Sequence, residues 1–231
     1  AGKNVIHYSM ELSETHVGNR YDSRITGIPT KELRRRMVEA ENELARFMGG
    51  QLMIKEYPPK VATINTIKFH VGRLLSNGFE PDLIIIDYGD LMKSRRGYEQ
   101  KRFELESVFE DLRAMSMELK LPIWTATQSN RDGFNDEIIT IDKVGEAINK
   151  AHVVDFFGTF SQRKFHVGKN RMGSANVNFN IEMKPECAFI ELNDDQSAGF
   201  TASEKLTNLL DGGGNSRSKI GSLYQSHKDG G

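Results

Sequence analysis

Four consecutive aliphatic residues followed by an aspartate, Leu83-Ile84-Ile85-Ile86-Asp87, constrain the fold of this chain more than any other segment. Pro81 and Gly89 bound the run and favour a short strand. A strand that is apolar at successive positions is buried on both faces, as in a parallel sheet covered by helices. Asp87 would end this strand, at the edge where open α/β sheets bind their ligands.

Strands and helices alternate along most of the chain. We expect strands at 4–10, 51–57, 83–87, 123–127 and 153–160. We expect helices at 13–24, 29–48, 66–77, 103–121 and 145–150. The segments 164–167, 177–183 and 188–192 alternate in polarity like antiparallel strands. This order predicts an α/β fold, a mainly parallel sheet flanked by helices with an antiparallel C-terminal extension.

Charge and cysteine content exclude several classes of protein. The 31 basic and 32 acidic residues leave a net charge of −1, which excludes a globally basic nucleic-acid binder but not a local basic patch. The single cysteine, Cys187, excludes an internal disulfide framework and a multi-cysteine zinc site. No apolar run approaches the roughly 18 residues of a membrane span. The N-terminus resembles no signal or transit peptide, so we expect a cytoplasmic protein.

Polar residues also follow two other predicted strands. Glu11 follows the first, where a carboxylate can activate a water for attack on a γ-phosphate. Gln128 follows the fourth, where an amide can bond to a γ-phosphate or to the attacking water. Asp87 has the position from which nucleotide hydrolases hold Mg²⁺ through its water shell. Taken singly, each residue also fits a structural role, such as a helix N-terminal acid for Glu11.

Two groups of cations are further candidates. Lys169 and Arg171 lie two residues apart, between two predicted strands, so on a hairpin both can project together. Such a pair suits an arginine finger that reaches a neighbour's phosphates, and a solvated basic turn is the alternative. The segment 93–102 holds five basic residues, one acidic residue and an aromatic. Arg95 and Arg96 within it are candidate contacts to single-stranded DNA, and a solvated loop is again the alternative.

Five segments, taken in order, carry a resemblance to a known family. The segments YSMELS, LIIIDYGDLM, IWTATQSNR, HVVDFFGTF and VGKNRMGSANVNFNIE resemble the RecA-like motor domain of DnaB-type replicative helicases, those of phages most of all. The resemblance runs from Asn4 to Leu192. We therefore expect a motor domain at 1–192 and a flexible Gly/Ser-rich tail at 193–231.

The resemblance implies a role for each candidate at the strand ends and on the hairpin. Glu11 matches the catalytic glutamate that polarises water, and Asp87 matches the Walker B aspartate. Gln128 matches the residue that senses the state of the nucleotide. Lys169 and Arg171 match the pair that stabilises transition-state charge in trans, from the adjacent subunit.

The resemblance also implies a DNA contact. The loop before the helix at 145 is similar to the family's central-channel loop, so Lys143 and Gly145 are expected to meet the phosphates of single-stranded DNA. A glycine lets the backbone N–H approach a phosphate closely, and the lysine adds charge. Gly145 as a simple helix start is the alternative.

The whole protein would then be a homo-hexameric ring that uses ATP and Mg²⁺ to move along single-stranded DNA and unwind duplex DNA. A primase and a helicase loader are the implied partners. Two other functions stay open. A RecA/RadA-type recombinase shares the core, and a non-catalytic RecA-like assembly module would keep only its shape.

One departure from the family is large. The phosphate-binding loop G-x-x-x-x-G-K-[ST] does not occur in the sequence. The run Gly213–Lys219 comes nearest, but Ser218 stands in the second Gly position and Ile220 in the Ser/Thr position. We therefore expect a motor domain that is incomplete at its N-terminus, without its first strand and P-loop, and that binds ATP poorly alone.

Overall fold

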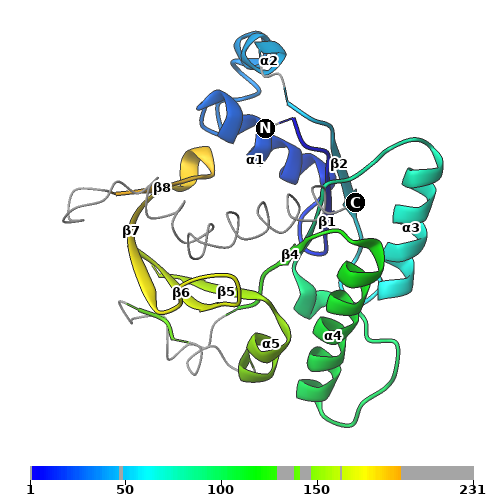
Figure 1. Ribbon diagram of the computed structural model, residues 1–231. Helices are drawn as coiled ribbons and strands as arrows, with labels where there is room; N and C mark the ends of the chain where they lie inside the picture. Colours follow the sequence, from blue (N-terminus) through cyan, green and yellow to red (C-terminus); the bar gives the residue numbers. More distant parts are fainter. Residues whose placement is uncertain (1, 47–48, 129–137, 141–146, 162, 194–231) are drawn as a thin grey trace, which may run out of the picture.

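The computed structural model describes residues 2–46, 49–128, 138–140, 147–161 and 163–193 (Figure 1). The helices are α1 (Glu14–Thr26), α2 (Met37–Arg46), α3 (Ile64–Ser76), α4 (Lys101–Leu119) and α5 (Ala147–Val153). The strands are β1 (Val5–Ser9), β2 (Leu52–Glu56), β3 (Leu83–Asp87), β4 (Ile123–Thr125), β5 (Phe156–Phe160), β6 (Lys164–Asn170), β7 (Val177–Lys184) and β8 (Phe189–Leu192). The predicted tail, 193–231, lies outside the described residues except for Asn193.

The parallel sheet has the strand order β2-β1-β3-β4, and we call it sheet A. Helices α3 and α4 lie on one face of this sheet and α1 lies on the other (Figure 1). The core between the sheet and the α3–α4 layer contains apolar residues of β1, β3 and both helices: Ile6, Tyr8, Ile64, Ile67, Val71, Ile84, Ile86, Val108, Leu112 and Met115. The predicted parallel sheet flanked by helices is confirmed.

The prediction that β3 is buried on both faces was wrong for the face opposite α3 and α4, which is only partly buried. Ile84 and Ile86 are fully buried, whereas Leu83, Ile85 and Asp87 are only partly buried. On this face α1 packs mainly against β2, and its Tyr21 contacts His7 of β1.

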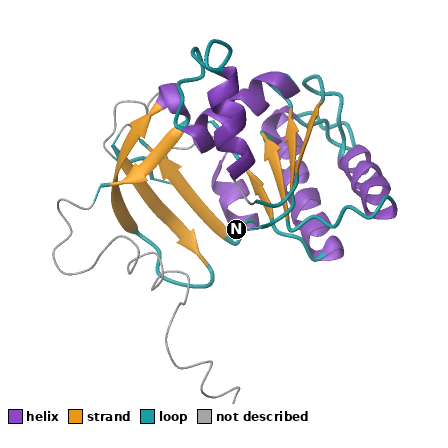
Figure 2. Cartoon of the chain, turned by 90° about the horizontal axis from the view of Figure 1, so that it is seen from above, coloured by secondary structure: helices purple, strands orange, loops and turns teal. Residues whose placement is uncertain are grey.

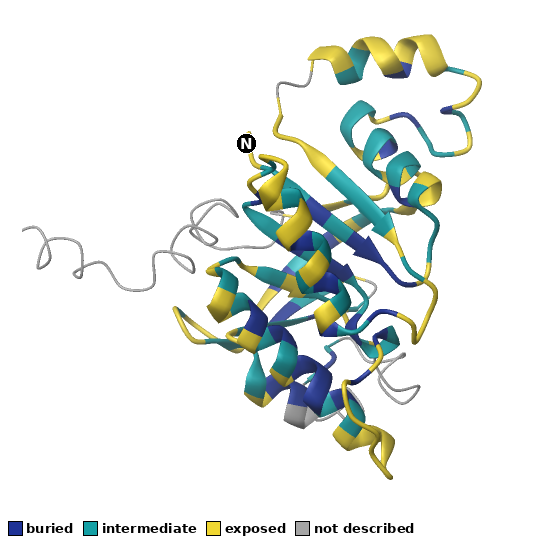
Figure 3. Ribbon diagram, turned by 90° about the vertical axis from the view of Figure 1, so that its right-hand side faces the viewer, coloured by how far each residue is buried: buried dark blue, intermediate teal, exposed yellow. Residues whose placement is uncertain are grey.

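The predicted second helix begins later than expected. Residues 30–36 form turns in which the amides of Glu32 and Arg35 donate to carbonyls only three residues back, and α2 starts at Met37. Ile28, Leu33 and Ala40 form a small cluster of their own, apart from the main core. Helix α2 therefore stands away from the body of the protein, with most of its residues exposed (Figure 3).

The antiparallel sheet has the order β5-β6-β7-β8, and we call it sheet B. It stands beside sheet A when the molecule is seen from above (Figure 2). Phe156, Phe160 and Phe179 each stack against Phe165. The predicted antiparallel extension is confirmed, with one correction. Lys169 lies within β6 and not between strands, because β6 continues to Asn170.

Within the described ranges, no helix is both long enough and apolar enough to cross a membrane.

Candidate functional site

The carboxyl edge of sheet A brings the ends of β1 and β3 side by side. Ser9 and Asp87 are partners in the parallel ladder, and the amide of Met10 donates to the carbonyl of Asp87 over 2.7 Å. Glu11 follows directly and is exposed, while Asp87 is partly buried. Glu56 ends β2 at the same level, so three carboxylates lie along one edge.

Tyr88 shows how close the acidic groups come to one another. Burial raises the pKa of Tyr88, and the charges of Glu11, Asp90 and Asp87 raise it further. The side-chain amide of Gln128 donates to the hydroxyl of Tyr88 over 3.0 Å. The structure therefore gathers Glu11, Asp87 and Gln128 around one tyrosine, although they follow three different strands.

Just beside this edge, the backbone that follows β3 lies close to β4, and hydrogen bonds through the Thr125 hydroxyl link the two. The amide of Gly89 donates to the hydroxyl of Thr125 over 2.9 Å, and that hydroxyl donates to the carbonyl of Ile86 over 2.9 Å. A Cβ at position 89 would lie 3.0 Å from the Thr125 hydroxyl and 3.3 Å from the Phe109 ring. A glycine is therefore what lets the chain after Asp87 turn this close to β4.

A buried ionic network lies next to the gathered residues, and the sequence pattern did not reveal it. Lys150 of α5 donates to Asp90 over 2.7 Å and to the Thr127 hydroxyl over 2.9 Å. The Thr127 hydroxyl in turn donates to the other oxygen of Asp90 over 2.7 Å. Only 3% of the Lys150 side chain is exposed. The sequence carried one signal, a lysine within a predicted helix otherwise rich in apolar and small residues.

Lys169 and Arg171 lie elsewhere and are already bonded within the chain. Lys169 donates to the carbonyls of Ala151 (2.7 Å) and His152 (3.0 Å), near the C-terminal end of α5. Burial lowers the pKa of Lys169, and the charge of Arg171 lowers it further. Arg171 pairs with Asp155 at 2.6 Å. Among the described residues, no hydrogen bond or ion pair joins either cation to the edge of sheet A.

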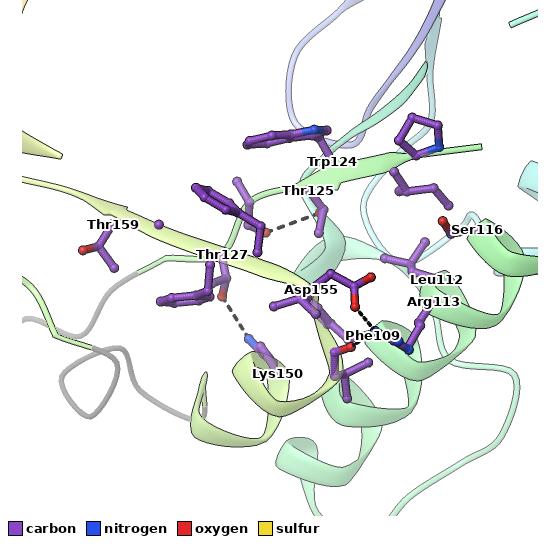
Figure 4. A pocket seen from close by; sticks show the side chains of 18 of the residues that line it. Phe109, Leu112, Arg113, Ser116, Trp124, Thr125, Thr127, Lys150, Asp155 and Thr159 are labelled. Atoms are coloured by element: carbon purple, nitrogen blue, oxygen red, sulfur yellow. Dashed lines mark hydrogen bonds and ion pairs between the residues drawn. The ribbon is translucent and has the colours of Figure 1, made fainter. Parts of the chain in front are cut away.

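Asp155 is shared by two arginines. Arg113 of α4 pairs with the same carboxylate at 2.9 Å (Figure 4). Although burial opposes the effect, hydrogen bonds and charges from Arg113 and Arg171 lower the pKa of Asp155. Asp155 would therefore keep a partner if Arg171 turned away.

Of the four predicted DNA contacts, the structure describes Arg95 and Arg96. Arg95 makes two hydrogen bonds to Asp111 of α4, one of them at 2.8 Å, and so is held against its own domain. Arg96 is exposed. Lys143 and Gly145 lie outside the described residues, as does the start of the helix predicted at 145.

A pocket of about 630 Å³ opens between α4, β4, α5 and β5 (Figure 4). Its walls are mainly apolar and aromatic, including Phe109, Trp124, Phe156 and Phe165. Thr127 and Lys150 stand at its polar side. None of Glu11, Asp87, Gln128, Lys169 and Arg171 lines this pocket, so it is separate from the gathered residues.

The carboxylates at the edge of sheet A fit one mode of Mg²⁺ coordination, in which the protein supplies only part of the metal's ligand shell. In the parts of the chain that the structure describes, no group of three or more His, Cys, Asp or Glu side chains converges on one point. An all-protein cage is therefore absent from those parts. In phosphoryl-transfer sites, Mg²⁺ takes one or two carboxylates and completes its shell with waters and phosphate oxygens. Asp87 offers that donor chemistry.

A family model and the similar curated proteins point to the same family. A family model described as "DnaB-like helicase C terminal domain" matches residues 1–137. The DnaB-like replicative helicase of Enterobacteria phage T4 is 25% identical over 170 residues, which are 67% of this chain and 35% of that protein. A probable plasmid replicative DNA helicase of Chlamydia muridarum is 28% identical over 178 residues, 72% of this chain and 39% of that protein. The chain thus spans well under half the length of these relatives.

Solved structures agree on the fold. One solved ATPase domain superposes with a TM-score of 0.70 at 13% identity, covering 81% of this chain and 74% of that one. A DnaB-like replicative helicase, solved in a study of its interactions with primase, gives a TM-score of 0.70 at 14% identity, covering 81% and 50%. The predicted RecA-like fold class is therefore confirmed.

Proposed function

The chain belongs to the family of DnaB-like helicase C-terminal domains, and from that membership we propose that it is motor sequence of a ring-shaped replicative DNA helicase. The whole protein would hydrolyse ATP, move along single-stranded DNA and separate the duplex. The observation that carries this proposal is the convergence of Glu11, Asp87 and Gln128 on one edge of a parallel sheet, around Tyr88. Ligands of open α/β sheets bind at this edge.

In the proposed reaction each gathered residue has a separate task. Exposed Glu11 accepts a proton from the attacking water. Asp87 would hold Mg²⁺ through the metal's water shell, and the bound metal would supply the positive charge that phosphoryl transfer requires. Gln128 changes partner, from the Tyr88 hydroxyl to the γ-phosphate or the water, when nucleotide is bound.

Lys169 and Arg171 would serve the nucleotide of the adjacent subunit. Their place on and just after β6, away from Glu11 and Asp87, suits residues that act across an interface. The shared position of Asp155 also supports the role, because Arg113 keeps that carboxylate paired when Arg171 turns to a phosphate. An arginine that reaches into a neighbour's site adds positive charge where the transition state accumulates negative charge.

Single-stranded DNA and a homo-hexameric ring are the proposed partner and assembly. Exposed Arg96 is a better DNA contact than Arg95, because Asp111 already binds Arg95. Lys143 and Gly145 remain proposed contacts. A primase and a loader are proposed partners as well, and the solved DnaB-like helicase is itself described with its interactions with primase.

The test is ATP hydrolysis by the protein at its full encoded length, with and without single-stranded DNA, followed by unwinding of a forked duplex. We expect DNA-stimulated hydrolysis, unwinding, and rings in electron micrographs. Filaments and strand exchange without unwinding would favour a recombinase. A protein that neither binds nor hydrolyses ATP would favour the non-catalytic assembly module.

A further inference from the structure

We propose that helix α5 connects the nucleotide-sensing end of β4 to the Lys169–Arg171 end of β6. Two sets of hydrogen bonds make this connection, and we call them the first and the second joint. Lys150 is the positioning residue of the first joint. The inference rests on the proposed function and adds to it a route between adjacent ATP sites. Both joints consist of described residues with direct hydrogen bonds.

The first joint is the network of Lys150, Asp90 and Thr127. Its three hydrogen bonds form a closed triangle, with lengths of 2.7, 2.9 and 2.7 Å. The Lys150 ammonium also lies 5.2 Å from the centre of the Phe109 ring. A buried ammonium is stable only while it keeps such partners. When Thr127 or Asp90 shifts, Lys150 must therefore follow.

The partners of Lys150 adjoin the proposed nucleotide contacts in the chain. Thr127 directly precedes Gln128, and Asp90 follows closely after Asp87. The Gln128 side chain bonds to Tyr88, which lies between Asp87 and Asp90. A change of partner at Gln128 therefore reaches Thr127 through the backbone and Lys150 through one hydrogen bond.

The second joint lies in the same last turn of α5, directly after Lys150. Lys169 donates to the carbonyls of Ala151 and His152, which belong to the last turn. Arg113 donates to the carbonyl of Val153. Beyond the helix, the carbonyl of Asp155 accepts the Arg171 amide over 2.9 Å, and its carboxylate binds the Arg171 side chain.

The two joints adjoin each other, because Lys150, Ala151 and His152 are consecutive residues of the last turn of α5. A shift of Lys150 therefore reaches the carbonyls that Lys169 binds within a single helical turn. The first joint would report the state of a subunit's own nucleotide, and the second would position the cations that act on its neighbour's nucleotide. Such an arrangement makes hydrolysis at adjacent interfaces dependent on one another.

The test compares three variants of the full-length protein in the presence of single-stranded DNA: Lys150→Met, the pair Asp90→Asn with Lys150→Met, and Lys31→Met. Lys31 is exposed and serves as the control for loss of one positive charge. The readouts are kcat and the shape of the dependence of hydrolysis on ATP concentration. We expect a sigmoidal dependence for the parent and Lys31→Met, and a hyperbolic one for both Lys150 variants. We expect kcat to stay within about threefold, because no residue assigned to nucleotide is changed.

The double variant separates coupling from stability. Lys150→Met alone leaves Asp90 without its cation in a largely buried position, whereas removing both charges relieves that penalty and should restore the melting temperature. A double variant that is stable but hyperbolic supports the inference. A sigmoidal response in the double variant overturns it, as does a parent that hydrolyses ATP without cooperativity. A parent that hydrolyses no ATP overturns the proposed function together with the inference.

Discussion

Ser9 and Asp87 come from distant parts of the sequence and are direct partners in the parallel ladder between β1 and β3. The hydrogen bond from the Met10 amide to the Asp87 carbonyl extends this pairing past the end of β1. The carboxylates of Glu11 and Asp87 therefore start from neighbouring points of the backbone. Their roles can be separated, because one is exposed and the other partly buried.

Glu11→Gln should abolish turnover and spare nucleotide binding. The amide keeps the shape of the side chain but cannot accept a proton, and loss of a general base commonly costs on the order of 10²–10⁴-fold in rate. Steady-state hydrolysis and the affinity for a fluorescent ATP analogue measure the two effects. Glu41→Gln on the exposed surface of α2 is the control. Parental turnover in Glu11→Gln would remove this residue from the mechanism.

Asp87→Asn should weaken the response to Mg²⁺ more than it harms folding. The amide retains the size of the carboxylate and loses the charge that holds the metal's water shell. A titration of hydrolysis against Mg²⁺ should shift to higher concentration, while the melting temperature changes little. An unfolded variant would assign Asp87 to structure, and a stable one with an unchanged Mg²⁺ requirement would remove Asp87 from metal binding.

Arg171→Ala should be complemented in mixed rings by subunits carrying Glu11→Gln. Each parent ring lacks one essential group at every interface, and mixed rings contain some interfaces where an intact Glu11 meets an intact Arg171. An arginine finger contributes roughly 10³–10⁵ in rate, so partial recovery is measurable as ATP hydrolysis.

This mixing experiment needs proof that subunits exchange, which fluorescence transfer between labelled subunits provides. The outcome against a role in trans is an Arg171→Ala ring that hydrolyses ATP at the parental rate. Arg171 would then be only a partner of Asp155 beside Arg113.

Gly158→Ala should destabilise the domain. A Cβ at this position of β5 would lie 2.5 Å from the nearest ring carbon of Phe165, which stacks against three other phenylalanines. Overpacking of this kind costs about 1–3 kcal/mol, measurable by denaturant unfolding. Gly72→Ala is the matched control, because an added Cβ would meet no atom within 4 Å apart from its chain neighbours and the backbone of its own helix, and α3 gains a better helix former. Equal stability of the two variants would contradict the packing argument.

Stability should fall as the pH is lowered through the range where histidine titrates. Burial lowers the pKa of His7 below 6.5, against the opposing charge of Asp87, and its Nε2 is buried with no hydrogen-bond partner among the described residues. The unfolded chain therefore binds a proton first, so the loss begins near pH 6.5 and is complete below the folded-state pKa.

Chemical unfolding at several pH values between about 7.5 and 5.5 measures this effect. His7→Gln should give a shallower dependence but not a flat one, because burial also lowers the pKa of His70. A slope identical to that of the parent would show that His7 does not carry the effect.

Local sequence was enough to predict most elements of the fold. Each of the signals used depends on residues that are near one another in the chain. Examples are the aliphatic run before Asp87, the Ser13 cap of α1 and the alternating pattern of β7. The same holds for the placement of Glu11, Asp87 and Gln128 at strand ends, since parallel strands present their carboxyl ends at one edge. The start of α2 was missed because turns and helix share their residue preferences there.

Only the tertiary structure decided which charges are buried and what they bind. Lys150 and Asp90 are 60 residues apart, and the apolar and small residues around Lys150 indicate its burial but not the partner that it binds. The bonds of Lys169 to α5 and the sharing of Asp155 by two arginines likewise depend on contacts between elements far apart in the chain. Periodicity and capping act over a few residues, whereas the cost of burying a charge is offset by partners that only the folded chain brings near.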